Sequence, residues 1–266
     1  MALTRNFVSL QEQGFKVMQW NILADSLALD FPKAPQQALD WSFRAPLILS
    51  EISNVDPLIL CAQEVDHFED FLLPELDKLG YSGIFNKKKD WHKDGTAIFF
   101  KQEVELLWSD VHWYSQSNQF FLATKLRFWN TELYVVSTHL KAKKPYEKIR
   151  TSQAKELVNY LEALENIPII ICGDFNSLPD SETQEVLKSS PLGLLNPYQE
   201  VLGETQFTTL KYRKTLEKKT EDYILYKGLQ VTGVYSLPTE EEIGPSALPS
   251  EEYPSDHLSL AVKFNL

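Results

Sequence analysis

Side chains that could bind metals or transfer protons stand at the ends of several apolar runs in this sequence. The groups that end these runs are Asn21, Glu64, His139, Asp174 and Asn176. A buried strand ends in polar groups of this kind where the sheet meets solvent and a ligand is bound. Because separate runs repeat the pattern, the sequence predicts that these side chains share one site for metal-assisted acid/base chemistry.

Oxygen donors dominate the set of candidate ligands. Asp222 and Asp256 add two carboxylates in the final third of the chain, whereas His139 and His257 supply the imidazoles. Hard oxygen donors with few thiolates favour Mg²⁺ or Mn²⁺ over zinc. We also expect Asp256 and His257, which follow a Pro-Ser turn, to open the last strand, a placement typical of an acid/base pair.

Short strands must position these residues. Four apolar runs lead into the polar endings. Between residues 95 and 139 the segments that separate the predicted strands are too short to form helices, which predicts that neighbouring strands there are antiparallel. The predicted strands are 15–21, 58–64, Thr96–Phe100, Val104–Trp108, Phe120–Phe128, 133–139, 169–174, Asp222–Tyr226, Val231–Leu237 and His257–Phe264.

Helices are predicted from apolar residues at helical spacing. Residues 67–79 show this spacing and end at Gly80, and residues 146–165 repeat it after Pro145. Residues 40–53 also read as a helix, provided that Pro46 falls in its first turn. Helix-linked strands followed by hairpins predict an α/β fold with two mixed sheets packed face to face and helices outside.

Composition indicates one soluble globular domain spanning residues 1–266, since no linker divides the chain. The 26 Lys and Arg against 37 Asp and Glu give a net charge of −11, which argues against broad, charge-driven binding of nucleic acids. Cys61 and Cys172 lie in apolar runs and are expected to be free buried thiols. No stretch is long and apolar enough to span a membrane, and the first residues lack a clear targeting pattern. We therefore expect a cytoplasmic protein, with a mitochondrial form made from a longer precursor as the open alternative.

Seven short motifs, taken together, resemble the endonuclease/exonuclease/phosphatase superfamily with its DNase I-like fold. Further segments, among them 64–68, 139–143 and 242–245, are most similar to its nocturnin-like branch, which is related to CCR4-type deadenylases. The motifs occur in the family's order, at 19–21, 63–65, 94–95, 138–140, 173–176, 222–224 and 255–257. The resemblance implies a four-layer α/β sandwich with the strand ends meeting at the junction of the two sheets.

The resemblance also implies roles for the candidate residues. Glu64 with Asn21 would hold Mg²⁺, with Mn²⁺ as a substitute, and Asp256 would lie beside the metal. Asp174 would activate the attacking water. The phosphate oxygens would receive hydrogen bonds from Asn176, His139 and His257, with Asp222 holding His257 and Asp94 supporting His139. Asp94 could equally be the first residue of an Asp-Gly turn.

Basic residues near the site bear on the substrate. Lys141 and Lys143 follow His139 closely, and Arg213 precedes Asp222 in an expected loop over the site. The resemblance implies that such residues grip the phosphates of NADP(H) while its 2′-phosphate is removed. Where Lys143 stands, Arg is common in the branch, and Lys gives up the bidentate geometry of a guanidinium.

Two other functions stay open at this stage. One is a poly(A)-specific 3′-exoribonuclease acting on RNA, although residues 217–221 offer no aromatic for stacking adenine and the chain has no leucine-rich repeat to recruit partners. The other is a catalytically inactive scaffold on the same fold. Every expected catalytic position is filled, which argues against the scaffold.

Overall fold

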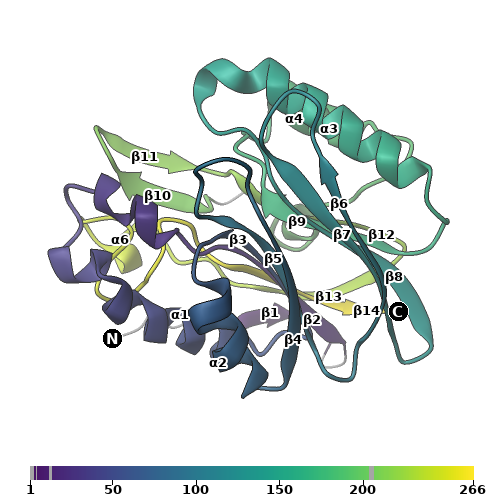
Figure 1. The fold of residues 1–266 in the computed structure, drawn as a ribbon, viewed down its shortest axis with the longest axis horizontal. Helices are drawn as coiled ribbons and strands as arrows, with labels where there is room; N and C mark the ends of the chain where they lie inside the picture. Colours follow the sequence, from purple (N-terminus) through teal and green to yellow (C-terminus); the bar gives the residue numbers. More distant parts are fainter. Residues whose placement is uncertain (1–2, 4, 12–13, 204–206) are drawn as a thin grey trace.

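Two β-sheets pack face to face, and helices cover both outer faces (Figure 1). This computed structural model describes residues 3, 5–11, 14–203 and 207–266. The expectation that the chain lacks a targeting signal drew in part on residues 1–2, 4 and 12, which are not among the described residues. The predicted four-layer α/β sandwich is confirmed.

The larger sheet has seven strands, and only one neighbouring pair, β2 with β3, is parallel. Ile59 and Cys61 of β3 face the second sheet, while Leu60 and Ala62 face outward against helices. Burial on both faces explains why this strand is apolar throughout rather than alternating. In sheet order the strands are β1 (Phe7–Ser9), β13 (Gln230–Tyr235), β14 (Leu260–Asn265), β2 (Phe15–Asn21), β3 (Ile59–Val65), β5 (Gly95–Lys101) and β4 (Tyr81–Lys87).

The smaller sheet has five strands, again with one parallel pair, β8 with β9. A separate hairpin of β10 (Thr209–Tyr212) and β11 (Leu216–Lys219) lies at the strand ends where the two sheets meet (Figure 1). In sheet order the five strands are β12 (Asp222–Lys227), β9 (Ile169–Asp174), β8 (Thr131–His139), β7 (Phe120–Phe128) and β6 (Glu105–Trp113).

Each sheet has its own cover of helices. The side chains of α1 (Trp41–Val55) and α2 (Leu73–Asp77) pack on the seven-stranded sheet, and those of α3 (Glu147–Glu162) and α4 (Glu182–Lys188) pack on the five-stranded sheet. A third apolar cluster fills the space between the sheets. The remaining helical segments are 3₁₀ turns at Asp25–Asp30, Gln36–Leu39 and Lys144–Tyr146, a π turn at Phe68–Leu72 before α2, α5 (Pro197–Leu202) and α6 (Glu240–Ile243).

Most predicted elements are confirmed within a few residues, including both buried free thiols. One error concerns Pro46, which lies in the second turn of α1 because the helix begins at Trp41 behind the N-cap Asp40. Pro46 cannot donate to the carbonyl of Ser42, but Ser42 is exposed, so water can bond to that carbonyl instead.

A second error concerns the last strand. It begins at Leu260, so the Asp256–His257 pair lies in the preceding loop rather than in the strand. That loop is nevertheless fixed, because His257 forms an isolated bridge with Thr209 of β10. Within the described residues no helix has the length and apolar character needed to cross a bilayer.

Candidate active site

Three predicted residues form a row along the edge of the five-stranded sheet. Asp174, the last residue of β9, is in register with His139 at the end of β8 and with Asp222 at the start of β12. All three are buried, with exposed fractions of 2%, 6% and 1%. Because neighbouring strands lie about 4.8 Å apart, regular β-pairing is sufficient to bring these side chains together.

The seven-stranded sheet supplies Asn21 and Glu64 opposite this row. The Asn21 amide donates from Nδ2 to Glu64 Oε1 at 3.1 Å and to Asp174 Oδ2 at 3.0 Å. Glu64 reaches this place through a β-bulge at which its backbone adopts a left-handed φ of 55°. A non-glycine residue held in that conformation is typical of functional sites.

The oxygens around Asn21 fit a divalent cation. Two carboxylates, Glu64 and Asp174, converge on one neutral amide, and the second Glu64 oxygen accepts only from the backbone N–H of Ala24 among the contacts described here. This is an arrangement of hard oxygen donors with excess negative charge, which suits Mg²⁺ or Mn²⁺. Glu64 and Asn21, the two predicted metal ligands, therefore lie side by side, with the Asn21 oxygen accepting from the backbone N–H of Leu23; their role as ligands stays a prediction.

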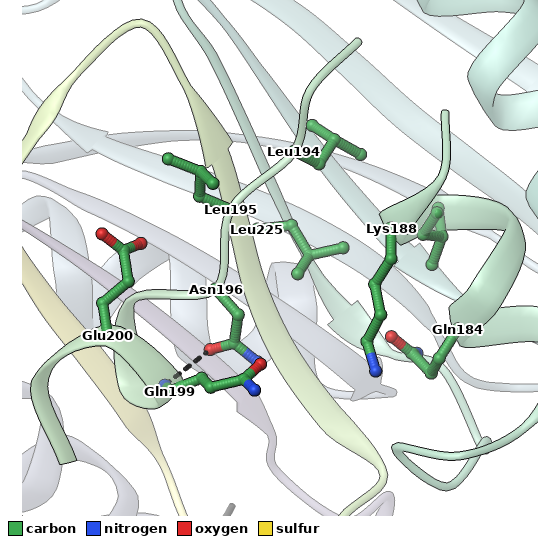
Figure 2. Close-up of a pocket in the computed structure, with 9 residues that line it drawn as sticks. Gln184, Lys188, Leu194, Leu195, Asn196, Gln199, Glu200 and Leu225 are labelled. Carbon is green, nitrogen blue, oxygen red and sulfur yellow. Dashed lines mark hydrogen bonds between the residues drawn. The ribbon is translucent and has the colours of Figure 1, made fainter. Parts of the chain in front are cut away.

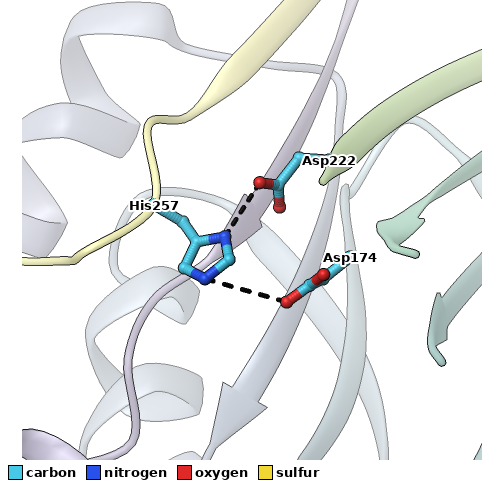
Figure 3. A group of neighbouring side chains, drawn as sticks. All are labelled: Asp174, Asp222 and His257. Carbon is cyan, nitrogen blue, oxygen red and sulfur yellow. Dashed lines mark hydrogen bonds and ion pairs between the residues drawn. The ribbon is translucent and has the colours of Figure 1, made fainter. Parts of the chain in front are cut away.

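His257 is held by Asp222, as predicted. Its Nδ1 lies 2.8 Å from Asp222 Oδ2, and its Nε2 points toward Asp174 Oδ2 at 3.8 Å (Figure 3). Burial alone would lower the pKa of His257, but the Asp222 carboxylate outweighs it and raises that pKa to about 10. The three side chains lie close enough to hold a cation themselves, although Asp222 is already occupied by the imidazole.

Asp174 and Asn176 are linked through the backbone. The Asn176 N–H donates to Asp174 Oδ1 at 2.9 Å, and Asn176 has a left-handed φ of 49°. Burial raises the pKa of Asp174 to about 7, with His257 opposing the rise. A carboxylate with such a pKa can both accept and release a proton near neutral pH.

His139 is the least satisfied of the site residues. Its Nδ1 is buried without a hydrogen-bond partner among the described residues, and its Nε2 lies 3.6 Å from Asp174 Oδ2. Burial, followed by the charges of Lys88 and His257, holds its pKa well below the usual value, so the ring is neutral. A neutral imidazole has one N–H to offer to a phosphate oxygen.

The expected contact between Asp94 and His139 is replaced by another one. Asp94 is buried and its Oδ2 accepts from the ammonium of Lys88, which is buried as well. A buried carboxylate needs a charged partner, and Lys88 lies closer than the imidazole because β4 and β5 pair directly before and after the loop that carries both residues. In the sequence Lys88 stands between two other lysines, and such a run gives no sign that one of them is buried.

Lys211 is the main residue that sequence reasoning missed. The side chain is buried, and its Nζ lies 2.9 Å from Asp256 Oδ2 and 3.2 Å from His257 Nε2. Asp256, expected beside the metal, is therefore paired with a lysine. The alternation of β10 offered a signal, since it places Lys211 on the same side as Thr209, which is also buried.

A cleft of about 770 Å³ opens beside Asn176. Lys143 and Arg213 line it, as predicted, and Lys211 joins them. Arg213 stacks its guanidinium over Phe31 at 5.0 Å, and its Nε has no hydrogen-bond partner among the described residues. Lys141 instead holds its ammonium over the ring of Tyr146, 5.2 Å from the ring centre.

A second, smaller groove of about 260 Å³ is lined by a different set of residues (Figure 2). Its lining combines leucines such as Leu194 and Leu225 with the amides of Asn196 and Gln199. The Asn196 side chain is engaged as the N-cap of α5, accepting from the backbone of Tyr198 and Gln199. None of the predicted site residues lines this groove.

The comparison with known families agrees with this geometry. The profile of the Endonuclease/Exonuclease/phosphatase family matches residues 18–257, which include all the site residues described above. The chain belongs to this family. The family assignment makes it a phosphoric ester hydrolase of the phosphodiesterase and nuclease type, a class of metal-dependent enzymes.

Several relatives in the endonuclease/exonuclease/phosphatase family are similar over nearly the whole chain. Nocturnin of Xenopus laevis is 39% identical, over 99% of this chain and 77% of its own length. The human Nocturnin catalytic domain with bound sulfate superposes with a TM-score of 0.83 at 35% identity, covering 98% of this chain and 96% of that one. ANGEL2, a 2′,3′-cyclic phosphatase in complex with adenosine-2′,3′-vanadate, gives a TM-score of 0.86 at 26% identity, with 99% of both chains covered.

Proposed function

We propose that this protein is a Mg²⁺-dependent 2′-phosphatase that converts NADP(H) to NAD(H), with residues 1–266 acting as one catalytic domain. The observation that carries the proposal is the cluster of Lys143, Lys211 and Arg213 at a cleft beside Asn176, on a chain whose net charge is −11. A local basic cluster on an acidic protein favours a small phosphorylated ligand over a long polyanion.

The site residues supply the steps of an in-line hydrolysis. Asp174 takes a proton from the attacking water, since its pKa of about 7 allows both proton uptake and release. Asn176 and the imidazoles His139 and His257 donate hydrogen bonds to the phosphate oxygens as negative charge builds there. Mg²⁺ held by Glu64 and Asn21, with Mn²⁺ as a substitute, would add neutralisation of that charge.

The composition of the cleft supports a compact nucleotide. Its volume is in the range of sites for small molecules, about 300 to 1,000 Å³. Acidic residues also line it, including Asp180, Glu182 and Glu217. These carboxylates would repel the extended sugar–phosphate backbone of an RNA. A dinucleotide is short enough to contact only the basic residues of the cleft. The adenosine-2′,3′-vanadate bound to ANGEL2 shows that a relative on this fold accepts an adenosine derivatised at the 2′ position.

The second candidate function is a poly(A)-specific 3′-exoribonuclease. It is favoured by two further lysines that line the cleft, Lys144 and Lys219, which could follow a nucleic-acid backbone. Lys219 is paired with Glu217 at the cleft, and this ion pair weakens the attraction of Lys219 for a phosphate. The dinucleotide is therefore the first choice.

A paired assay separates the two substrates. The purified protein with Mg²⁺ is expected to release inorganic phosphate from NADP⁺ and NADPH and to form NAD⁺ and NADH, which chromatography identifies. Glu64→Ala should abolish the reaction. Shortening of oligo(A) with NADP⁺ left intact would reject the proposal in favour of the exoribonuclease.

A matched pair of lysine variants tests the basic cluster. Lys143→Gln should raise the KM for NADP⁺ about tenfold, the effect of losing one phosphate contact of about 1.4 kcal/mol. Lys218→Gln is the control, because Lys218 is half-exposed on β11 and pairs with Glu240. Equal KM values for the two variants would show that Lys143 does not bind the substrate.

A further inference from the structure

A layer of buried polar side chains closes the apolar core between the two sheets at the end where the candidate active site lies. Along β2, β3 and β8 these side chains continue the inward-facing rows of Val17, Cys61 and Val135, because residues two apart on a strand point to the same face. Polar groups buried in this way must bond to one another. The members of the layer are Gln19, Gln63, Ser137 and Asp222, with exposed fractions of 0%, 0%, 0% and 1%.

The four side chains form one continuous chain of hydrogen bonds. Gln63 donates from Nε2 to Ser137 Oγ at 3.0 Å and to Gln19 Oε1 at 2.8 Å. Gln19 in turn donates from Nε2 to Gln63 Oε1 at 2.7 Å and to Asp222 Oδ1 at 3.1 Å. Each amide thus uses both of its N–H donors. The chain leaves the five-stranded sheet at β8, crosses to β3 and β2, and returns to the five-stranded sheet at β12.

The charge of Asp222 sets the direction of this chain. An ionised carboxylate can only accept, so Gln19 must turn its amide N–H toward Asp222. In that orientation Gln19 Oε1 accepts from Gln63, whose second N–H reaches Ser137. A flip of either amide would bring two oxygens or two N–H groups face to face away from solvent, which is costly. The chain therefore has a single stable orientation.

Gln19 completes the support of the carboxylate that holds His257. Asp222 Oδ2 accepts from Thr208 Oγ1 at 2.7 Å and from His257 Nδ1 at 2.8 Å (Figure 3). Asp222 Oδ1 accepts from Gln19 alone among the residues that the structure describes. The terminal torsion of an aspartate is soft, so a carboxylate bonded at one oxygen can turn, whereas one bonded at both oxygens keeps its plane. That plane sets the direction of the imidazole, whose Nε2 points toward Asp174.

We propose that Gln19 is a positioning residue for hydrolysis: it fixes the Asp222 carboxylate and, through it, the imidazole of His257. Gln63 supports it by holding the Gln19 amide in the required orientation. The inference rests on the proposed hydrolysis of a phosphate ester but on no particular substrate. Because Gln19 is fully buried beneath the site, it acts on turnover rather than on substrate binding.

The first test observes the imidazole without any substrate. The Nδ1 proton of His257 should give a proton NMR line that exchanges slowly with water, since it is bonded to a buried carboxylate, and His257→Ala identifies the line by its loss. Gln19→Met keeps the side-chain volume but removes the donor to Asp222, and should broaden or abolish the line through exchange. The control is Thr124→Val, which removes a buried 3.0 Å bond to the carbonyl of Val135 and should leave the line intact.

The second test separates kcat from KM. Gln19→Met should lower kcat about tenfold, as for the loss of one hydrogen bond to a charged group, and leave KM within about twofold. In an Asp222→Ala background the same change should lower kcat by less than about twofold, because the carboxylate through which Gln19 acts is gone. Rates are measured with NADP⁺, or with oligo(A) if NADP⁺ is not hydrolysed.

Two results would overturn the inference. One is an NMR line of Gln19→Met that matches the wild type, or that is lost equally in Thr124→Val. The other is a loss of kcat that recurs undiminished in Asp222→Ala, as a general loss of packing would produce. If Gln19→Met does not fold, Gln63→Met decides by the same two tests, because it leaves the Gln19 amide free to turn. Intact NADP⁺ with shortened oligo(A) would reject the proposed substrate and leave this inference standing.

Discussion

The two sheets contribute to the site in different ways. In the five-stranded sheet, His139, Asp174 and Asp222 become neighbours through regular strand pairing. In the seven-stranded sheet, Glu64 reaches the site only through a β-bulge and a left-handed backbone conformation. Regular pairing places the groups that we propose handle protons and phosphate, whereas a local irregularity places Glu64, the proposed metal ligand. A bulge redirects one side chain without disturbing the rest of its strand.

The largest expected effect comes from the seven-stranded side. Glu64→Ala removes the carboxylate proposed to bind the metal, so kcat should fall by about 10³-fold or more, as expected when metal charge stabilisation worth several kcal/mol is lost. Steady-state phosphate release and Mn²⁺ binding measure the two consequences. The fold should persist, because Glu64 is partly exposed. Retained Mn²⁺ affinity in this variant would contradict the assignment of the metal to this sheet.

The five-stranded side should show a different signature. Asp222→Asn keeps the shape but removes the charge that orients and protonates His257, so kcat should fall by about 10²-fold, at the low end for general acid/base groups. Metal affinity should remain within about twofold, since Asp222 contacts His257, Thr208 and Gln19 rather than Glu64. If Mn²⁺ binding weakened as much as turnover, the division of labour between the sheets would be wrong.

A buried amide pair joins the two sheets and tests their coupling. Gln63 of β3 exchanges hydrogen bonds with Gln19 and also donates to Ser137 of β8 at 3.0 Å. Gln63→Met keeps the volume but leaves the Gln19 amide short of a partner, which should lower the free energy of unfolding by about 1 to 3 kcal/mol.

Urea denaturation of a matched pair gives the measurement. The control is Gln199→Met, an exposed position of α5, which should change the free energy of unfolding by less than about 0.5 kcal/mol. Equal stabilities for the two variants would show that this pair does not contribute to holding the sheets together.

The smallest effect concerns the helices over the five-stranded sheet. Glu147 of α3 accepts from Arg150 at 2.7 Å and from the hydroxyl of Thr183 in α4 at 2.9 Å. Burial would raise the pKa of Glu147, but these bonds outweigh it and lower that pKa. Glu147→Gln should therefore cost about 1 kcal/mol of stability at pH 7, the value of a typical hydrogen-bonded group.

The pH dependence of this difference has a definite sign. A carboxyl whose pKa is lower in the folded state stabilises the protein above its unfolded pKa, and the contribution is lost as pH falls through the folded pKa. Urea titrations should thus show the full difference between wild type and Glu147→Gln at pH 7 and a shrinking one below about pH 4.5. A difference that stays constant down to pH 3 would show that the charge of Glu147 is not involved.

Much of the fold and the polar strand endings could be predicted because both depend on local pattern. The apolar run before Asp174 reads as a strand buried on both faces, and the runs before Asn21 and His139 end where predicted. The predicted position of Pro46 within its helix and the predicted start of the last strand were wrong by a few residues. Element boundaries depend on capping and on packing, which periodicity does not report.

Charge pairing could not be predicted in the same way. Lys88 reads as one lysine in a basic run, yet it is buried against Asp94, and Lys211 lies 45 residues from the Asp256 that it neutralises. Whether a lysine is solvated or buried depends on which segments approach it in three dimensions. The left-handed conformation of Glu64 is likewise imposed by the sheet around it.

The sequence by itself determined the strands, their polar endings and the family, because side-chain periodicity and short motifs are properties of neighbouring residues. Only the tertiary structure decided how the acidic groups are neutralised. It left Glu64 and Asp174 around an amide, where a metal ion fits, and gave Asp256 a lysine from β10. The physical reason is that a buried charge takes its partner from whatever the fold brings within a few ångströms, irrespective of distance along the chain.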